Sequence, residues 1–209
     1  MRKFASLLGL LVLIGLALAG VFAIVASSGC LPGEGVPIRD FPIEAMLIPV
    51  RAFPKGWTDD PTGPSAPPLP PLGGYKSIER TEVFFYIANG VATEEIHRFA
   101  CTRQAADAFA SSKHSEFAEG EFSRGWLPPT ELQYRSPIAE QFYLACGQHG
   151  SIRMCRAIGQ YQEYFVLFNT HMSPGFMTYA DLEKILRAID GPMARYLRMD
   201  IPDAMPSSP

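Results

Sequence analysis

The 209-residue chain has no charged residue between Lys3 and Glu34, and it lacks the short motifs that identify common catalytic and cofactor sites. It contains no H-E-x-x-H zinc motif, no G-x-S-x-G nucleophile elbow, no glycine-rich phosphate loop and no C-x-x-C pair. The sequence therefore predicts no catalytic residue, no metal ligand and no cofactor.

Basic residues are also few. Lys and Arg total 18 against 21 Asp and Glu, the formal net charge is −3, and the basic residues are scattered along the chain. A nucleic-acid surface needs clustered positive charge, so we expect no nucleic-acid partner. The four histidines lie apart, and no two have metal-ligand spacing on an expected helix. These are His97, His114, His149 and His171.

The uncharged N-terminal stretch is itself the most specific signal in the chain. Arg2 and Lys3 precede an apolar run from Phe4 to Ala26, which is the pattern of an export signal. The run has about 23 residues, more than the roughly 7 to 15 of an ordinary signal core, and is long enough to cross a bilayer as a helix. Residues 1–30 are therefore expected to form a signal segment or a transmembrane anchor, with the two basic residues on the inner side.

Three outcomes stay open for this segment. Ser27-Ser28-Gly29-Cys30 resembles a bacterial lipobox, which implies lipidation of Cys30, although Ser27 stands where that pattern favours Leu. An uncleaved anchor is the second outcome, and cleavage after Ala17-Leu18-Ala19 with free secretion is the third. The first two both predict a membrane-attached domain on the outer face of a bacterial membrane.

Composition divides the rest into a leader and a domain. Residues 31–74 are expected to be an extended Pro/Gly-rich leader, because Pro54 to Gly74 is dense in both residue types and favours a polyproline spacer. Within the leader, Ile43 to Phe53 is apolar and predicts a short strand or helix packed on the domain, pinned by Phe53 and Trp57. The domain itself is expected at 75–198, and 199–209 as a tail.

The domain reads as strands and helices joined by hairpins. Strands are predicted from Val83 to Ile87 and Thr93 to Phe99 around an Asn89-Gly90 turn, with a possible short one at Leu132 to Arg135. A meander then follows, with strands at 141–146, 152–158 and 164–170 and turns at His149-Gly150 and Gly159-Gln160. One helix is expected from Thr102, its N-cap, to His114, and another from Thr178, ended or kinked by Gly191-Pro192.

The cysteines fix the expected register of the meander. A hairpin turning near Gly150 sets Cys146 opposite Cys155, close enough for a disulfide, and then pairs large residues with small ones across the strands. Cys101 is expected to be buried and reduced. The alternative readings are two unbonded thiols in the hairpin and a nucleophilic thiol at Cys101.

These elements predict an α+β fold, in which an antiparallel sheet has two or more helices packed on one face. The element order resembles that of the PsbP-like group of small extracytoplasmic domains and of many exported bacterial lipoproteins. The resemblance spans about Tyr75 to Arg198, rests on element order alone and implies no functional residue.

Two surfaces are candidates for function. Five acidic residues near the first helix offer carboxylates for hydrolysis, but the pattern favours a solvated face. These are Glu94, Glu95, Glu116, Glu119 and Glu121. The strand from Tyr164 is apolar on both faces, so helices or a partner must cover the second face, and incomplete cover would leave a protein-binding patch. The candidate patch residues are Tyr161, Tyr164, Phe165 and Leu167.

The sequence thus favours a membrane-tethered, extracytoplasmic binding or accessory protein whose ligand it does not identify. The alternatives are an exported hydrolase with an unrecognised site and a structural subunit of a membrane complex.

Overall fold

The computed structural model describes residues 30–31, 36–66, 71–118 and 125–199. The chain divides into two compact units, Met1–Gly35 and Val36–Pro209, and the fold described below is that of the second. The expected anchor, the Ala17–Ala19 cleavage site and most of the expected tail lie outside the described residues. No helix in the described ranges is long and apolar enough to cross a membrane.

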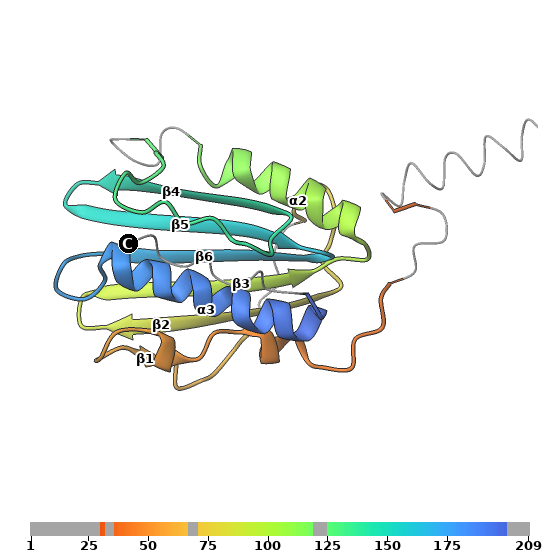
Figure 1. Cartoon of the computed structure of the whole chain (residues 1–209), viewed down its shortest axis with the longest axis horizontal. Coiled ribbons are helices and arrows are strands. Elements are labelled where there is room, and N and C mark those ends of the chain that lie inside the picture. The colour runs from red at the N-terminus through yellow and green to blue at the C-terminus, as the bar shows by residue number, and fades with distance from the viewer. Residues whose placement is uncertain (1–29, 32–35, 67–70, 119–124, 200–209) are drawn as a thin grey trace, which may run out of the picture. The chain divides into compact units, whose positions relative to one another are not determined.

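One antiparallel sheet forms the centre of the Val36–Pro209 unit (Figure 1). Its spatial order is β1-β2-β3-β6-β5-β4, and every neighbouring pair is antiparallel. The strands are β1 (Thr58–Asp59), β2 (Glu79–Ile87), β3 (Gly90–Arg98), β4 (Gln141–His149), β5 (Ile152–Tyr161) and β6 (Tyr164–Met172). The α+β class and the antiparallel sheet predicted from the sequence are confirmed, whereas 132–135 is not a strand.

The β4–β5 hairpin has the predicted register. Cys146 lies opposite Cys155, and the two form a disulfide with Cα atoms 4.0 Å apart. Phe142 lies opposite Gly159, where a side chain would collide with the Tyr161 ring, its nearest atom 2.7 Å from an added Cβ. The β5–β6 turn falls at Gln162 and Glu163 rather than at Gly159-Gln160, because β5 continues to Tyr161 and Gln162 adopts φ 54°.

The two long helices cover opposite faces of the sheet, which corrects the expectation of helices on one face. Alternate residues of a strand point to opposite faces. Val166 and Phe168 of β6 belong to the large core under α3 (Tyr179–Leu197), whereas Phe165 and Leu167 pack with α2 (Thr102–Ser115). The apolar character of both faces of β6 therefore reflects two separate cores.

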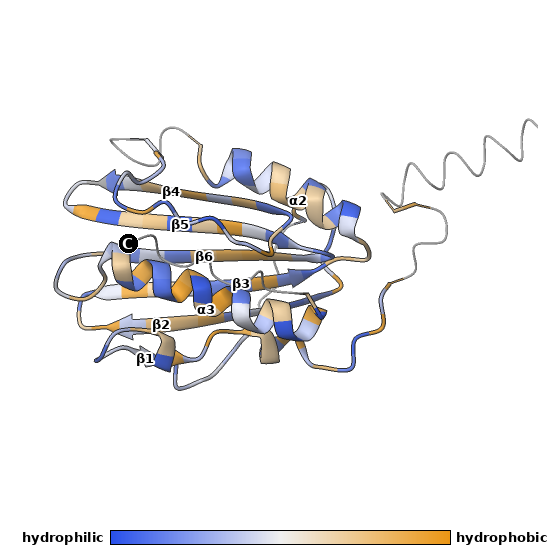
Figure 2. Ribbon diagram, in the orientation of Figure 1, coloured by the Kyte–Doolittle hydropathy of each residue, from blue (hydrophilic) through white to orange (hydrophobic). Residues whose placement is uncertain are grey.

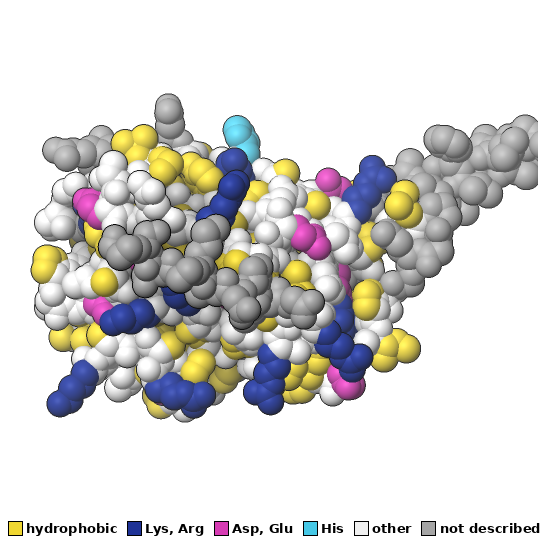
Figure 3. All heavy atoms as spheres, in the orientation of Figure 1, with side chains coloured by type: hydrophobic (Ala, Val, Ile, Leu, Met, Phe, Trp, Pro, Cys, Tyr) yellow, Lys and Arg dark blue, Asp and Glu magenta, His cyan; other side chains and the backbone are white. Residues whose placement is uncertain are grey.

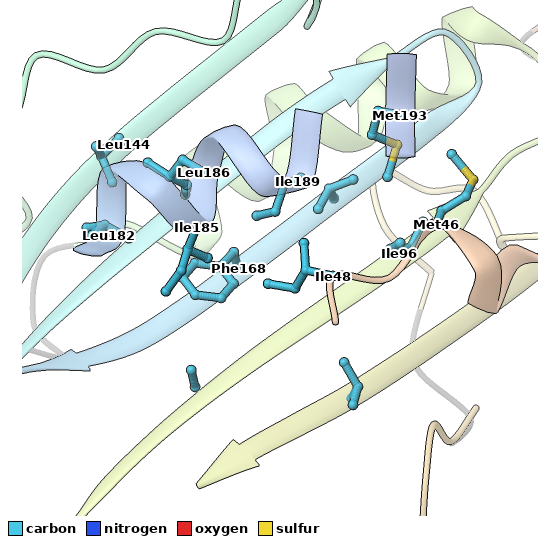
Figure 4. Close-up of a cluster of buried hydrophobic side chains, with 14 of the residues drawn as sticks. Met46, Ile48, Ile96, Leu144, Phe168, Leu182, Ile185, Leu186, Ile189 and Met193 are labelled. Atoms are coloured by element: carbon cyan, nitrogen blue, oxygen red, sulfur yellow. The ribbon is translucent and has the colours of Figure 1, made fainter. Parts of the chain in front are cut away.

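Helix α3 has the expected start and an unexpected continuation. Thr178 and Asp181 form a capping box, in which each side chain accepts a hydrogen bond from the other residue's backbone N–H. The helix then runs unbroken past Pro192 to Leu197. Figure 2 shows hydrophobic and hydrophilic residues alternating around its turns. Its apolar residues point into the core, among them Leu182, Ile185, Leu186, Ile189 and Met193 (Figure 4).

Helix α2 begins at Thr102, the residue expected to be its N-cap, and so starts one residue earlier than predicted. Cys101 is the N-cap and makes no side-chain capping bond, and the helix ends near the predicted His114. Its buried Ala105 and Ala108 allow close packing on β5 and β6. Gly73 of the preceding segment lies so close to this helix that an added Cβ would be 2.7 Å from the Asp107 backbone.

Much of the expected spacer belongs to the domain. The compact unit begins at Val36, not Tyr75. Two 3₁₀ helices, η1 (Ile43–Met46) and η2 (Val50–Ala52), confirm the docked segment expected at Ile43 to Phe53. Their buried neighbours Ile48 and Phe53 join the α3 core, and Figure 4 shows Ile48 beside Phe168. Thr58–Asp59 then pairs with β2 as the edge strand β1.

Several polar contacts fix this docked leader, which we define as residues 36–60. The Arg39 guanidinium binds the buried Glu163 carboxylate at 2.7 Å. The indole N–H of Trp57 donates to the backbone carbonyl of Phe176 at 3.0 Å. The backbone N–H of Ile48 donates to Oε2 of Glu94 at 2.8 Å. The leader is therefore held by directional bonds as well as by apolar burial.

Glu94 is the most unusual of these partners. Its side chain projects from β3 into the α3 core and is 0% exposed, so the expectation of a solvated carboxylate is wrong. Oε1 has no hydrogen-bond partner among the described residues. Burial raises the pKa of Glu94 from 4.5 to about 8, and the Ile48 N–H offsets only part of that effect. The carboxyl group is therefore mostly protonated at neutral pH.

Glu94→Gln tests this buried carboxyl group. Because the folded pKa exceeds the unfolded one, the neutral form stabilises the fold fully below pH 4.5, and this contribution is lost as pH rises through about 8. We expect the variant to gain stability relative to the natural chain between pH 5 and pH 8.5, by on the order of 2–5 kcal/mol. Urea unfolding at several pH values measures this change. The exposed Glu44→Gln is the matched control, and a pH-independent difference at Glu94 would contradict the assignment.

Candidate functional site

The aromatic patch expected from the sequence is not an exposed surface. Tyr161, Tyr164, Phe165 and Leu167 are 2%, 1%, 1% and 8% exposed. Tyr161 and Tyr164 belong to the α3 core, while Phe165 and Leu167 belong to the α2 core. A binding patch was expected only if the helices left one face of the strand partly uncovered. Both helices cover these side chains, so they form no such patch.

All four cysteines are disulfide-bonded. Besides the Cys146–Cys155 bond, Cys30 and Cys101 are both bonded, and no cysteine of the described residues is a free thiol. The expectation that Cys101 is reduced is therefore wrong, and with it the nucleophilic thiol.

A charged cluster on β2 and β3 is the first candidate site that the structure reveals. Arg80 and Glu82 lie on β2, directly opposite His97 and Glu95 of β3. All four side chains lie on the α2 face, because Glu95 and His97 pair with Leu167 and Phe165. We call this set the charged cluster.

The cluster is held together by contacts along and across the strands. Nη2 of Arg80 lies 3.5 Å from Oε2 of Glu82 and 3.8 Å from Oε2 of Glu95. Nε2 of His97 lies 3.3 Å from the same Glu95 oxygen. Burial and the nearby Glu95 charge raise the pKa of Glu82, and Arg80 opposes that rise. The cation therefore sits between two carboxylates that would otherwise repel each other.

The charged cluster favours a role in stabilising the fold over a role in hydrolysis. The four side chains are only 2–16% exposed, so a substrate could reach the carboxylates only after a rearrangement. No group of three or more His, Cys, Asp or Glu suited to a metal ion occurs in the described part of the chain. Of the other acids considered from the sequence, Glu116 binds Arg156 at 2.9 Å, and Glu119 and Glu121 lie outside the described residues.

A second polar centre surrounds Asp190 of α3. Its carboxylate accepts hydrogen bonds from the hydroxyls of Ser136 at 2.8 Å, Tyr161 at 2.9 Å and Tyr134. Burial raises the pKa of Asp190, and the three hydroxyl donors oppose that rise. The cluster joins α3 to β5 and to the loop before β4. No sequence pattern predicted it, because its members are far apart in the chain.

A groove beside the edge strand β4 is the most accessible candidate. Two adjoining pockets of about 300 and 390 Å³ share Arg135 and Phe142. The first lies between residues 128–135 and β4, and the second extends to Phe109 and Lys113 of α2. Lys113 lies over the Tyr143 ring, with Nζ 4.6 Å from its centroid. The groove therefore combines aromatic walls with two exposed cations.

No protein-family model matches the chain, and no significant match to a curated protein is found.

Arg80→Met tests the charged cluster as a stabilising unit. Without the cation, the pKa of Glu82 rises further above its unfolded value, so the loss of stability grows as pH increases. We expect a loss of roughly 1–3 kcal/mol at pH 7.5 and a smaller one at pH 5, from urea unfolding. Arg103→Met removes an exposed arginine from α2 and should change stability by less than about 0.5 kcal/mol. Equal losses at both pH values would contradict this account.

Proposed function

We propose that this protein is a membrane-tethered, extracytoplasmic binding or accessory protein. The observation that carries the proposal is the bonded state of all four cysteines, because disulfides persist mainly in oxidising compartments outside the cytosol. The uncharged apolar run from Phe4 to Ala26 supports membrane attachment. Together they favour a domain outside the cytosol, tethered by its N-terminal segment.

The cysteine chemistry also bears on the type of tether. Lipidation would use the sulfur of Cys30, and that sulfur is disulfide-bonded. We therefore favour a retained transmembrane anchor over a lipid anchor. Arg2 and Lys3 orient such an anchor with its N-terminus inside.

The groove beside β4 favours binding over catalysis. It is open, and it combines a first pocket lined mainly by aromatic and aliphatic side chains with a second lined mainly by polar ones, a mixture that is common for recognition surfaces. The rival function, hydrolysis, has one observation in its favour, the convergence of Glu82 and Glu95. Their low exposure makes the groove the better candidate. On the face drawn in Figure 3, Lys and Arg side chains occur at several separate places, which is unlike a nucleic-acid surface.

Cell fractionation tests the proposed location. We expect the full-length chain, expressed in bacteria, to sediment with membranes and to be digested when protease is added to spheroplasts. A cytosolic protein of the same cells, intact after the same treatment, controls for lysis. Recovery of the chain in the soluble cytosolic fraction would contradict the proposal.

Cys30→Ser tests the type of tether. Cys30 is disulfide-bonded, so its replacement leaves the partner sulfur of that bond as a free thiol. The variant should stay in the membrane and gain one thiol that reacts with maleimide after denaturation without reductant. Cys146→Ser is the matched control and should also gain one. An intact mass showing loss of residues 1–29 and an acyl group on Cys30 would contradict the retained anchor.

A further inference from the structure

The strand β4 has an open edge beside the groove. Among the described residues it is the last strand of the sheet, and β5 is the one strand that pairs along it. At one point Leu127 covers the free edge, where its N–H and C=O bond the C=O and N–H of Cys146 at 3.0 and 2.8 Å. Backbone groups of alternate residues in an antiparallel strand point the same way. Leu144 and Phe142 therefore direct their N–H and C=O groups outward, as Cys146 does.

The sequence explains why the cover stops at Leu127. Continuing the antiparallel register from Leu127 and Cys146 would set Pro129 opposite Leu144. Proline has no N–H, so neither Pro128 nor Pro129 can donate to the strand. Within residues 125–140, no backbone hydrogen bond to Phe142 or Leu144 is formed. The two prolines thus keep this part of the edge open.

The open backbone groups border the groove. Phe142, Tyr143 and Leu144 all line the pocket of about 300 Å³. Leu144 is 7% exposed and Phe142 is half-buried, and the part of each that faces this pocket is the part that an added strand would meet. A strand lying in this pocket would supply the backbone partners that these two residues lack within the described part of the chain.

The groove carries positive charge on an acidic protein. Arg135 and Lys113 are exposed there, and neither has an ion-pair partner among the described residues. The lining holds one carboxylate, that of Glu140, against these two cations. The whole chain has a net charge of −3. The local charge therefore favours a negatively charged occupant.

We propose that the edge of β4 from Phe142 to Leu144 binds an extended acidic segment of a partner protein, which adds to the sheet as a further strand. This inference rests on the proposed binding function and names the class of partner. Strand addition would supply backbone bonds to the two open residues, while the acidic side chains would approach Arg135 and Lys113. A second copy fits less well, because a twofold pairing would bring the same two cations of each copy together.

Amide exchange tests whether the edge is open and whether a peptide closes it. In the full-length chain in mild detergent, the amides of Phe142 and Leu144 should exchange at least 100-fold faster than those of Tyr143 and Ala145, which point toward β5. The probe is a capped nine-residue peptide in which valine alternates with glutamate. Its addition should slow exchange at Phe142 and Leu144 at least tenfold, while a valine–lysine peptide should not.

A charge-reversal pair tests the recognition of acidic residues. Arg135→Glu with Lys113→Glu should weaken binding of the glutamate peptide at least tenfold, measured by fluorescence anisotropy. Arg51→Glu with Lys55→Glu makes the same charge change at exposed positions of the docked leader and should alter binding less than twofold. Thermal unfolding checks that both double variants fold, since the first also removes the Lys113–Tyr143 contact.

Several results would overturn the inference. It fails if the Phe142 and Leu144 amides are already protected in the free chain, or if the two double variants bind the peptide equally. If protection of these amides from exchange increases with protein concentration, the edge binds a second copy of the chain, and the inference also fails. Binding is measured on purified protein, so a cytosolic location in the fractionation experiment would refute the proposed function while leaving this result standing.

Discussion

The two-sided apolar character of β6 is the constraint on which the rest of the fold depends. Val166 and Phe168 on one face and Phe165 and Leu167 on the other must all leave water, so the sheet needs a cover on each side. Helix α2 supplies one cover. Helix α3 supplies the other only together with the docked leader, whose Ile48 and Phe53 fill the same core. The leader is therefore part of the domain.

Covering both faces of the sheet buries several polar side chains, and each is stabilised in a different way. Asp190 receives three hydroxyl donors, and Arg80 lies between two carboxylates. Glu94 has a single backbone donor and remains mostly protonated instead. The same contact ties Ile48 of the leader to β3. The groove beside β4 lies outside both covers, and its prolines stop the chain from closing the edge.

The sequence predicted best where the signals were local. The register of the 141–158 hairpin and its disulfide followed from two cysteines around one turn, and the start of α3 followed from Thr178 and Asp181. Long-range features escaped it. The pairing of β1 with β2 joins a Pro/Gly-rich segment to a distant strand, and the burial of Glu94 depends on a leader that docks on β3. Pro192 resembles a helix end in the sequence, yet the helix continues because Met193 and Leu197 are buried in the core. The open edge of β4 could not be predicted from the sequence, because it depends on the pairing of Leu127 with Cys146.

Hydrogen exchange at the Ile48 amide tests the central claim, that the docked leader closes the α3 core, most directly. This amide bonds a fully buried carboxyl group, so the account predicts that it exchanges only through global unfolding, as slowly as the amides at the centre of β6. Exchange at the rate of an exposed loop, with β6 still protected, would show that the core forms without the leader and would contradict the account.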